Sequence, residues 1–111
     1  MVGTIDPEEI ARFSALASEW WDPEGKFQPL HRFNPSRLTY IRNQLCKKYC
    51  REVRSINSLN GLQILDIGCG GGLVAEPLCR MGASVTGIDA SAAYIATATL
   101  HADQNGLSID Y

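Results

Sequence analysis

The sequence has no long apolar run and little excess of charge of either sign. No stretch approaches the ~20 apolar residues that a helix needs to cross a bilayer. The first residues have neither the positive charge nor the apolar run of a secretory signal. The net charge is -2 at pH 7, so nucleic acid is not favoured as a partner. At 111 residues the chain suits one globular domain, and any membrane contact is expected to be peripheral.

Paired cysteine clusters and phosphate-binding motifs are also missing. Cys46 and Cys50 are spaced for one face of a helix, whereas Cys69 and Cys79 flank another helix. This spacing favours reduced thiols in a cytosolic-type compartment over a disulfide framework or a structural zinc site. No G-x-x-x-x-G-K-[ST] loop is present, which excludes a P-loop nucleotide hydrolase. We predict no metal site.

Positive charge is concentrated in one part of the chain. Arg and Lys are frequent between residues 37 and 54, where Glu52 is the only acid, whereas after Gly61 the only Arg or Lys is Arg80. A basic helix can lie on an anionic membrane or phosphate surface. A solvated helix face explains the same pattern and is the favoured interpretation.

Helical periodicity dominates the first half of the chain. Apolar residues at three- and four-residue intervals predict a helix over about 7–21. Three prolines and one glycine predict an ordered connector over 22–35. A second helix is expected over about 36–53, with Asn34 or Ser36 as its N-cap.

The second half alternates short apolar runs with helical stretches, which is the pattern of a parallel α/β sheet. Two helices are expected near 72–81 and 91–104, followed by Gly82 and Gly106 in the usual position after a helix. The expected strands are 63–67, 84–88 and 108–111.

A glycine-rich turn follows the first predicted strand and carries the chemistry. The run from Leu65 to Gly72 reads Leu-Asp-Ile-Gly-Cys-Gly-Gly-Gly. Glycines at such a turn let a ligand approach the backbone where a Cβ would collide. Asp89 ends the second predicted strand, where a carboxylate can accept both hydroxyls of a ribose. The two features together predict a nucleoside cofactor.

The details of the turn favour S-adenosylmethionine over a dinucleotide. In a G-x-G-x-x-G frame that starts at Gly68, Leu73 occupies the third glycine position. A frame from Gly70 fits a looser pattern but starts three residues beyond the strand, so a dinucleotide-dependent oxidoreductase is kept as a minority hypothesis. The arrangement Asp-x-Gly-x-Gly-x-Gly is used by methyltransferases, and Asp66 could order the cofactor's ammonium group. Cys69 is interpreted as a small packing residue because no neighbouring histidine marks it as a nucleophile.

Beyond this turn the sequence resembles the ubiquinone-biosynthesis O-methyltransferases, which methylate polyprenyl catechol-type hydroxyls. The glycine turn is common to many class I methyltransferases, so the N-terminal motifs are the specific part of the resemblance. The matching segments are Phe13, Ala17–Asp22, Gly25–Phe27, Leu30–Arg32, Asn34–Leu38, Leu65–Gly72, Thr86–Asp89 and Leu100–Ala102.

The resemblance implies roles for single residues. Arg37 would bind the cofactor, through its carboxylate, because the planar guanidinium binds carboxylates bidentately. Gly68 would contact the cofactor in the turn, together with Gly70, and Asp89 would hold the ribose. Trp20, Trp21 and His31 belong to the matching segments, and the tryptophans are expected chiefly to pack the N-terminal part against the rest. No residue is assigned as catalytic base.

The fold implied is α/β, a Rossmann-like class I methyltransferase fold that is incomplete, with the first three parallel strands and a helical N-terminal extension. The extension is expected over 1–60 and the N-terminal half of the cofactor-binding domain over 61–111. The family's sheet has seven strands, so we expect a fragment or truncated product. A non-catalytic S-adenosylmethionine-binding fragment and a methyltransferase of another substrate class are the alternatives.

The resemblance also implies the partners and the location. The substrate would be a prenylated quinol or phenol, and contact with other ubiquinone-biosynthesis proteins is left open. The expected location is the cytoplasm, with peripheral contact at the inner membrane, on the matrix side of mitochondria in a eukaryote.

Overall fold

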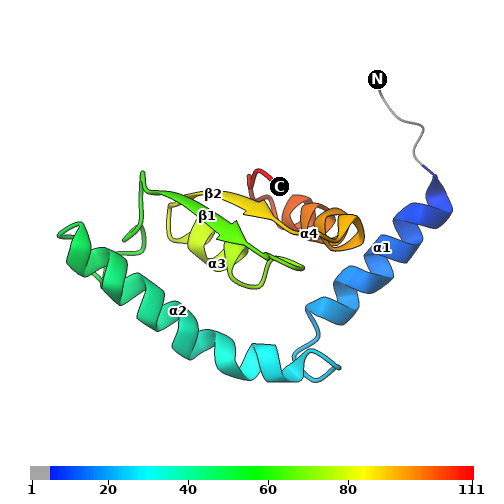
Figure 1. The fold of residues 1–111 in the computed structure, drawn as a ribbon, viewed down its shortest axis with the longest axis horizontal. Coiled ribbons are helices and arrows are strands. Elements are labelled where there is room, and N and C mark those ends of the chain that lie inside the picture. The colour runs from blue at the N-terminus through cyan, green and yellow to red at the C-terminus, as the bar shows by residue number, and fades with distance from the viewer. Residues whose placement is uncertain (1–5) are drawn as a thin grey trace.

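The computed structural model describes residues 6–111, so the first five residues of the predicted extension lie outside the described part. Two long helices precede a unit in which strands and helices alternate (Figure 1). The elements are α1 (Pro7–Trp20), α2 (Gln28–Lys48), β1 (Gln63–Ile67), α3 (Ala75–Arg80), β2 (Ser84–Ile88) and α4 (Ala92–Gln104). The boundary between extension and cofactor-binding unit at residue 60 stays a prediction.

The sheet consists of β1 and β2, which pair in parallel from Gln63 opposite Ser84 to Ile67 opposite Ile88. The predicted bounds of both strands are confirmed. The predicted third strand over 108–111 is wrong as a strand, because consecutive bridges do not form. Asp110 alone makes a parallel bridge, to Thr86.

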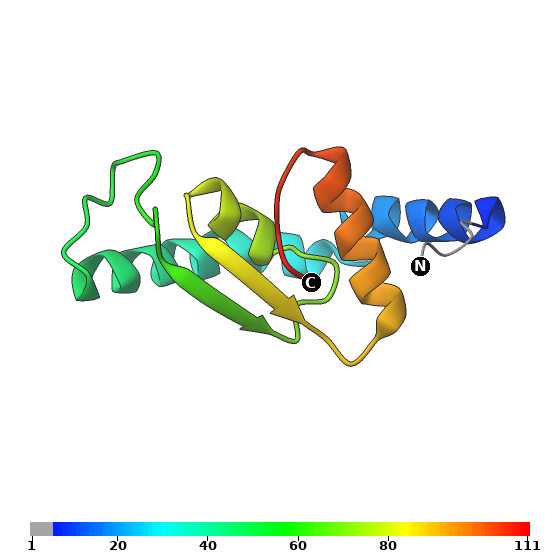
Figure 2. The ribbon, with the colours of Figure 1, turned by 90° about the horizontal axis from the view of Figure 1, so that it is seen from above.

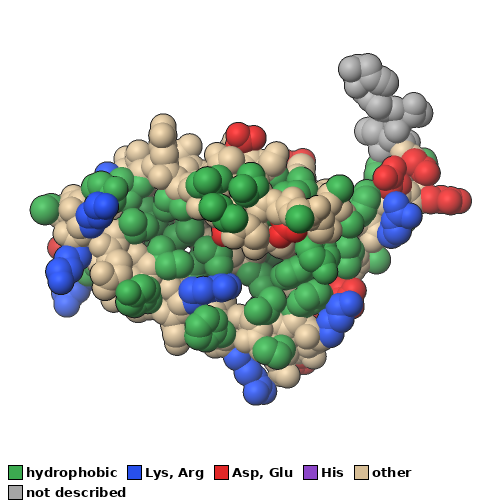
Figure 3. All heavy atoms as spheres, viewed as in Figure 1, with side chains coloured by type: hydrophobic (Ala, Val, Ile, Leu, Met, Phe, Trp, Pro, Cys, Tyr) green, Lys and Arg blue, Asp and Glu red, His purple; other side chains and the backbone are tan. Residues whose placement is uncertain are grey.

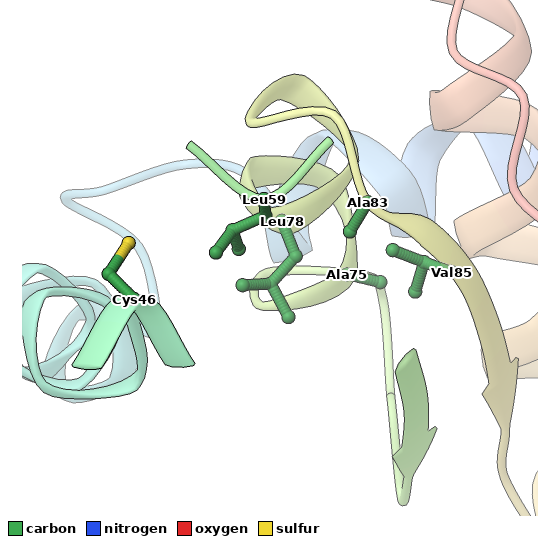
Figure 4. Packing of buried hydrophobic residues seen from close by; sticks show 6 residues of the cluster. All are labelled: Cys46, Leu59, Ala75, Leu78, Ala83 and Val85. Carbon is green, nitrogen blue, oxygen red and sulfur yellow. The ribbon is translucent and has the colours of Figure 1, made fainter. Parts of the chain in front are cut away.

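The core lies on one side of this sheet. Figure 1 shows α3 between the strands and α2, which forms the outer layer. Figure 4 shows the buried cluster between these layers, made of Cys46, Leu59, Ala75, Leu78, Ala83 and Val85. The opposite face, seen from above in Figure 2, carries no helix within residues 6–111. Leu65 and Ile67 are accordingly 55% and 75% exposed.

Local signals set the starts of α1 and α4. The Asp6 side chain caps α1 by accepting from the Glu8 backbone N–H, and Pro7 begins the helix. Ser91 caps α4 in the same way by accepting from Tyr94 N–H. Both predicted helices are confirmed to within a residue or two.

The predicted start of α2 is wrong. The connector expected over 22–35 ends early, and α2 begins at Gln28 with Pro35 inside it. Neither Asn34 nor Ser36 is its cap, because Phe27 precedes the first turn without a side-chain cap bond. A proline inside a helix loses one N–H bond. The side chain of Asn34, beside the proline, donates to the Leu73 carbonyl just after the glycine turn.

The ends of α2 and α3 also differ from the predictions. Cys50 has a left-handed φ of 54°, so α2 stops at Lys48, not at residue 53, and Cys46 and Cys50 do not share a helical face. Gly72 has φ 96°, which a right-handed helix cannot contain. The helix α3 therefore starts at Ala75 and not at residue 72. Gly82, with φ 101°, follows its end as predicted.

Candidate cofactor site

The glycine turn joins the carboxyl end of β1 to α3. Gly68, Gly70 and Gly72 adopt φ values of 76°, 55° and 96°, which residues other than glycine rarely adopt. The backbone N–H groups of Gly68 and Cys69 both donate to the Ile88 carbonyl, at 2.8 and 2.9 Å. The turn is therefore fastened to the end of β2, the neighbouring strand.

A cavity of about 230 Å³ lies beside this turn. Four of the residues predicted to bind the cofactor line it, namely Arg37, Asp66, Gly68 and Gly70. Trp20 at the end of α1 and Leu30 in α2 form part of its wall. The N-terminal helices and the α/β unit thus enclose one site.

Asp66, one of the residues that line this cavity, has one carboxylate oxygen without a partner. Its Oδ2 atom is buried and has no hydrogen-bond partner within residues 6–111. Burial raises the pKa of the Asp66 carboxyl, the Arg37 guanidinium opposes that rise, and the Asp89 carboxylate adds to it. A buried acceptor without a partner is costly, so the site suits a ligand that brings a donor or a cation.

Arg37 is held in place by Asn34, one turn earlier on α2. Its Nε and Nη2 atoms donate to Asn34 Oδ1 at 3.3 and 2.7 Å, and Asn34 Nδ2 donates to the Leu73 carbonyl at 2.8 Å. This anchoring role of Asn34 was not predicted from the sequence. The spacing of three residues between Asn34 and Arg37 could have revealed it, because such residues are neighbours on a helix.

Asp89 adjoins the cavity and does not line it. Its Oδ2 atom accepts from Gly70 N–H at 2.9 Å, and its Oδ1 atom accepts from Ser91 N–H at 2.8 Å. The carboxylate therefore links the glycine turn to the start of α4. Each oxygen of a carboxylate has a second lone pair, so these bonds leave room for two further donors.

The remaining residues singled out in the sequence surround the turn. Trp20 is buried and stacks on Phe27 with 4.1 Å between ring centroids. Trp21 donates from Nε1 to the Gly71 carbonyl at 3.1 Å, and His31 Nε2 donates to the Trp20 carbonyl at 2.8 Å. His31 is thus engaged with backbone of the extension, and packing of the two tryptophans against the turn agrees with the prediction.

Cys69 lies within the turn as a buried thiol. Burial, followed by the nearby Asp66 and Asp89 carboxylates, raises its pKa to about 11. The thiol is therefore protonated at neutral pH, which supports the interpretation of Cys69 as a packing residue.

The described part of the chain has no metal-ligand cluster, disulfide or membrane-spanning helix. Within residues 6–111 no group of three or more His, Cys, Asp or Glu side chains is placed to hold a metal ion. All four cysteines are free. No helix in this range is both long and apolar enough to span a bilayer.

Sequence comparisons identify relatives along nearly the whole chain. A family model described as a methyltransferase domain matches residues 64–111. Ubiquinone biosynthesis O-methyltransferases from Bradyrhizobium diazoefficiens and Chelativorans sp. are 60% and 59% identical to this chain over 108 residues. These matches cover 97% of this chain and 43% of each relative.

A solved structure confirms the expected α/β fold class. The magnesium protoporphyrin IX methyltransferase from Synechocystis, solved with bound S-adenosylmethionine, superposes with a TM-score of 0.58 at 22% identity. The match covers 94% of this chain and 50% of that enzyme. The chain is therefore a homologue of the ubiquinone biosynthesis O-methyltransferases, built on part of a methyltransferase fold, and it spans less than half the length of the curated relatives it matches.

Proposed function

We propose that this chain binds S-adenosylmethionine and forms the cofactor-binding part of an O-methyltransferase of ubiquinone biosynthesis. The observation that carries the proposal is that Asp66 and Arg37 both line one cavity beside the glycine turn. The matches to ubiquinone biosynthesis O-methyltransferases at up to 60% identity support the substrate class, a prenylated catechol-type hydroxyl.

The residues of the cavity fit the methionine end of this cofactor. That end carries an ammonium and a carboxylate. The Asp66 carboxylate would accept from the ammonium, and the Arg37 guanidinium would bind the carboxylate. The backbone at Gly68 and Gly70 would lie against the same moiety without interference from side chains.

Asp89 would hold the ribose at the other side of the turn. Its two oxygens keep lone pairs for the ribose hydroxyls after accepting from Gly70 and Ser91. These two bonds also fix the carboxylate before the ligand arrives, which lowers the ordering cost of binding.

In the whole enzyme, S-adenosylmethionine supplies a methyl group on an electrophilic sulfonium. The contribution proposed for this chain is positioning, which holds the cofactor in one orientation while a phenolic oxygen approaches. We assign no catalytic base to the chain.

Calorimetric titration with S-adenosylhomocysteine tests the proposal, with NAD titrated beside it. We expect the chain to bind S-adenosylhomocysteine and not NAD. Asp89→Ala should weaken this binding at least tenfold. Asp103→Ala, which replaces an exposed acid on α4, should leave it unchanged. Preference for NAD would replace the methyltransferase hypothesis with that of an oxidoreductase. No binding by the folded parent chain would contradict the proposal for this chain.

We further propose that α2 lets the protein contact an anionic membrane from the cytoplasmic side. Figure 3 shows Lys and Arg side chains, with apolar ones between them, along the edge of the molecule formed by α2. Phe33 and Tyr40 are 60% and 66% exposed on this helix, and Lys47 and Lys48 lie in its last turn. Basic residues near an anionic surface contribute about 1 kcal/mol each.

Vesicle flotation tests this contact. Lys47→Gln with Lys48→Gln should release the chain from vesicles that contain anionic lipid, whereas Arg12→Gln on α1 should not. Equal flotation of both variants and the parent would contradict a role for α2.

A further inference from the structure

Trp21 connects the glycine turn to α4, although it does not line the cavity. Its indole N–H donates to the Gly71 carbonyl at 3.1 Å. The same ring stacks on the imidazole of His101, with 4.0 Å between centroids and an interplanar angle of 1°. The orientation of the indole, and with it the hydrogen bond to the turn, is therefore set by His101.

His101 is itself fixed by a buried carboxylate. Its Nδ1 atom donates to Glu76 Oε2 at 2.6 Å, and the Glu76 side chain has no solvent exposure. Arg80, one turn later on α3, approaches Glu76 Oε1 at 3.5 Å. A buried carboxylate is costly unless it is paired and hydrogen-bonded, so Glu76 strongly favours this one position of the imidazole.

The opposite side of the turn is occupied by the neighbouring tryptophan. A Cβ at Gly70 or Gly71 would lie 2.8 or 2.7 Å from atoms of the Trp20 ring. The peptide at Gly71 is thus held between a ring that packs on it and a ring that hydrogen-bonds to it. Trp20 and Trp21 are consecutive at the end of α1, so a single helix end controls both contacts.

We propose that Glu76, His101 and Trp21 form a positioning relay that fixes the Gly71 carbonyl and so holds the glycine turn in the shape that binds the nucleoside cofactor. The inference rests on the proposed function, because it assigns the relay to cofactor affinity. The three side chains lie outside the lining of the cavity. They act on the ligand through the turn and are positioning residues.

The substitution Trp21→Phe separates this role from general packing. Phenylalanine keeps a six-membered ring that can stack on His101, and it loses the N–H that reaches Gly71 together with the second ring of the indole. We expect the dissociation constant for S-adenosylhomocysteine to rise about threefold to tenfold, the effect of one hydrogen bond. The urea midpoint of unfolding should fall modestly, as for the loss of one hydrogen bond, whereas a purely structural contact would lower the midpoint and leave affinity unchanged.

The indole N–H signals in a nuclear magnetic resonance spectrum report on the relay directly. The chain has two tryptophans, so Trp21→Phe assigns both signals. In His101→Ala the Trp21 signal should shift and its N–H should exchange faster with water, and affinity should fall at least as far as in Trp21→Phe. Glu76→Gln should keep more of the parent's signal and affinity than His101→Ala, because its amide oxygen can still accept from His101 while its amide nitrogen faces Arg80.

Each outcome decides the proposal. Parent-like affinity in both Trp21→Phe and His101→Ala, with the parent binding S-adenosylhomocysteine, would overturn the relay and leave the proposed function intact. Failure of the folded parent to bind would overturn the proposed function, and the relay's role in affinity with it. If His101→Ala does not fold, the affinity and signal of Trp21→Phe decide the matter.

Discussion

The α/β unit and the N-terminal helices contribute to the same cavity in different ways. Four of the six residues in the buried core cluster belong to the α/β unit, whereas Cys46 of α2 and Leu59 precede residue 61. The exposed large side chains of α1 and α2 include Ile10, Phe33 and Tyr40. Yet the extension places Trp20 and Arg37 in the wall of the site. The α/β unit therefore supplies most of the buried cluster, with Leu38, Ile41 and Leu45 of α2 packed against it, whereas both regions line the binding site.

The sequence comparisons divide along the same line. The methyltransferase family model begins at residue 64, in β1, and does not cover the helices. The ubiquinone biosynthesis enzymes match 97% of the chain and so include them. The solved methyltransferase structure covers 94% of the chain, so the fold of the helices is matched beyond the ubiquinone biosynthesis enzymes as well.

The largest expected effect tests where stability resides. Leu78→Ala removes a fully buried side chain of α3 and should lower the free energy of unfolding by about 2–5 kcal/mol. Ile10→Ala in α1, where the side chain is 42% exposed, should cost less than about 1 kcal/mol. Urea unfolding of both variants measures the difference. Similar losses would show that the two regions share one core.

The next effect tests the contact between the regions. A Cβ at Gly71 would meet Trp20 Cγ at 2.7 Å, so Gly71→Ala should destabilise by about 1–3 kcal/mol and separate the turn from α1. Gly106→Ala is a matched control, because its Cβ meets nothing within 4 Å and only its φ of 67° opposes alanine. Tryptophan fluorescence during urea unfolding follows both. An equal loss of unfolding free energy in the two variants would argue against a tight contact between Gly71 and Trp20.

A smaller effect is expected at the bond that joins α2 to the turn. Asn34→Ala removes the 2.8 Å hydrogen bond to the Leu73 carbonyl and the partner of Arg37. We expect a loss of about 1 kcal/mol in unfolding free energy and a weaker affinity for S-adenosylhomocysteine. Thr39→Ala, an exposed position on the same helix, serves as the control. Unchanged affinity in Asn34→Ala would contradict the anchoring role.

The smallest expected effect has the opposite sign. The folded pKa of Asp66 is raised by burial, so the ionised carboxyl opposes folding once the pH exceeds its ordinary value near 4. Asp66→Asn should therefore be more stable than the parent at pH 7.5, by less than about 1 kcal/mol, and the difference should vanish as the pH falls below about 4. Binding should weaken in the same variant. Lower stability of Asp66→Asn at pH 7.5 would contradict the raised pKa.

Local signals in the sequence predicted some elements accurately and others poorly. The bounds of β1 and β2 follow from short apolar runs that end at the glycine turn and at Asp89, and Asp6 and Ser91 act as caps. The start of α2 was missed because Pro29 and Pro35 look like breaks. Asn34, in the stretch that was expected to be a connector, binds the Leu73 carbonyl, and no local pattern encodes this tertiary contact.

The candidate site could be predicted only where its residues are neighbours in the sequence. Asp66, Gly68 and Gly70 are neighbours in sequence, so their meeting follows from the turn. The place of Arg37 in the same cavity was predicted only through the family resemblance. The stacking of Trp21 on His101 joins residues eighty positions apart and had no signal in the sequence. Long-range contacts of this kind need coordinates.

The most direct test of the shared site is calorimetric titration of Arg37→Gln with two ligands, S-adenosylhomocysteine and 5′-methylthioadenosine, which lacks the amino and carboxyl groups. If the extension and the α/β unit hold one cofactor together, Arg37→Gln weakens binding of the first ligand by about tenfold or more and leaves the second at the parent's affinity. Equal affinities of parent and variant for S-adenosylhomocysteine would show that the extension does not bind the cofactor, and would contradict the account.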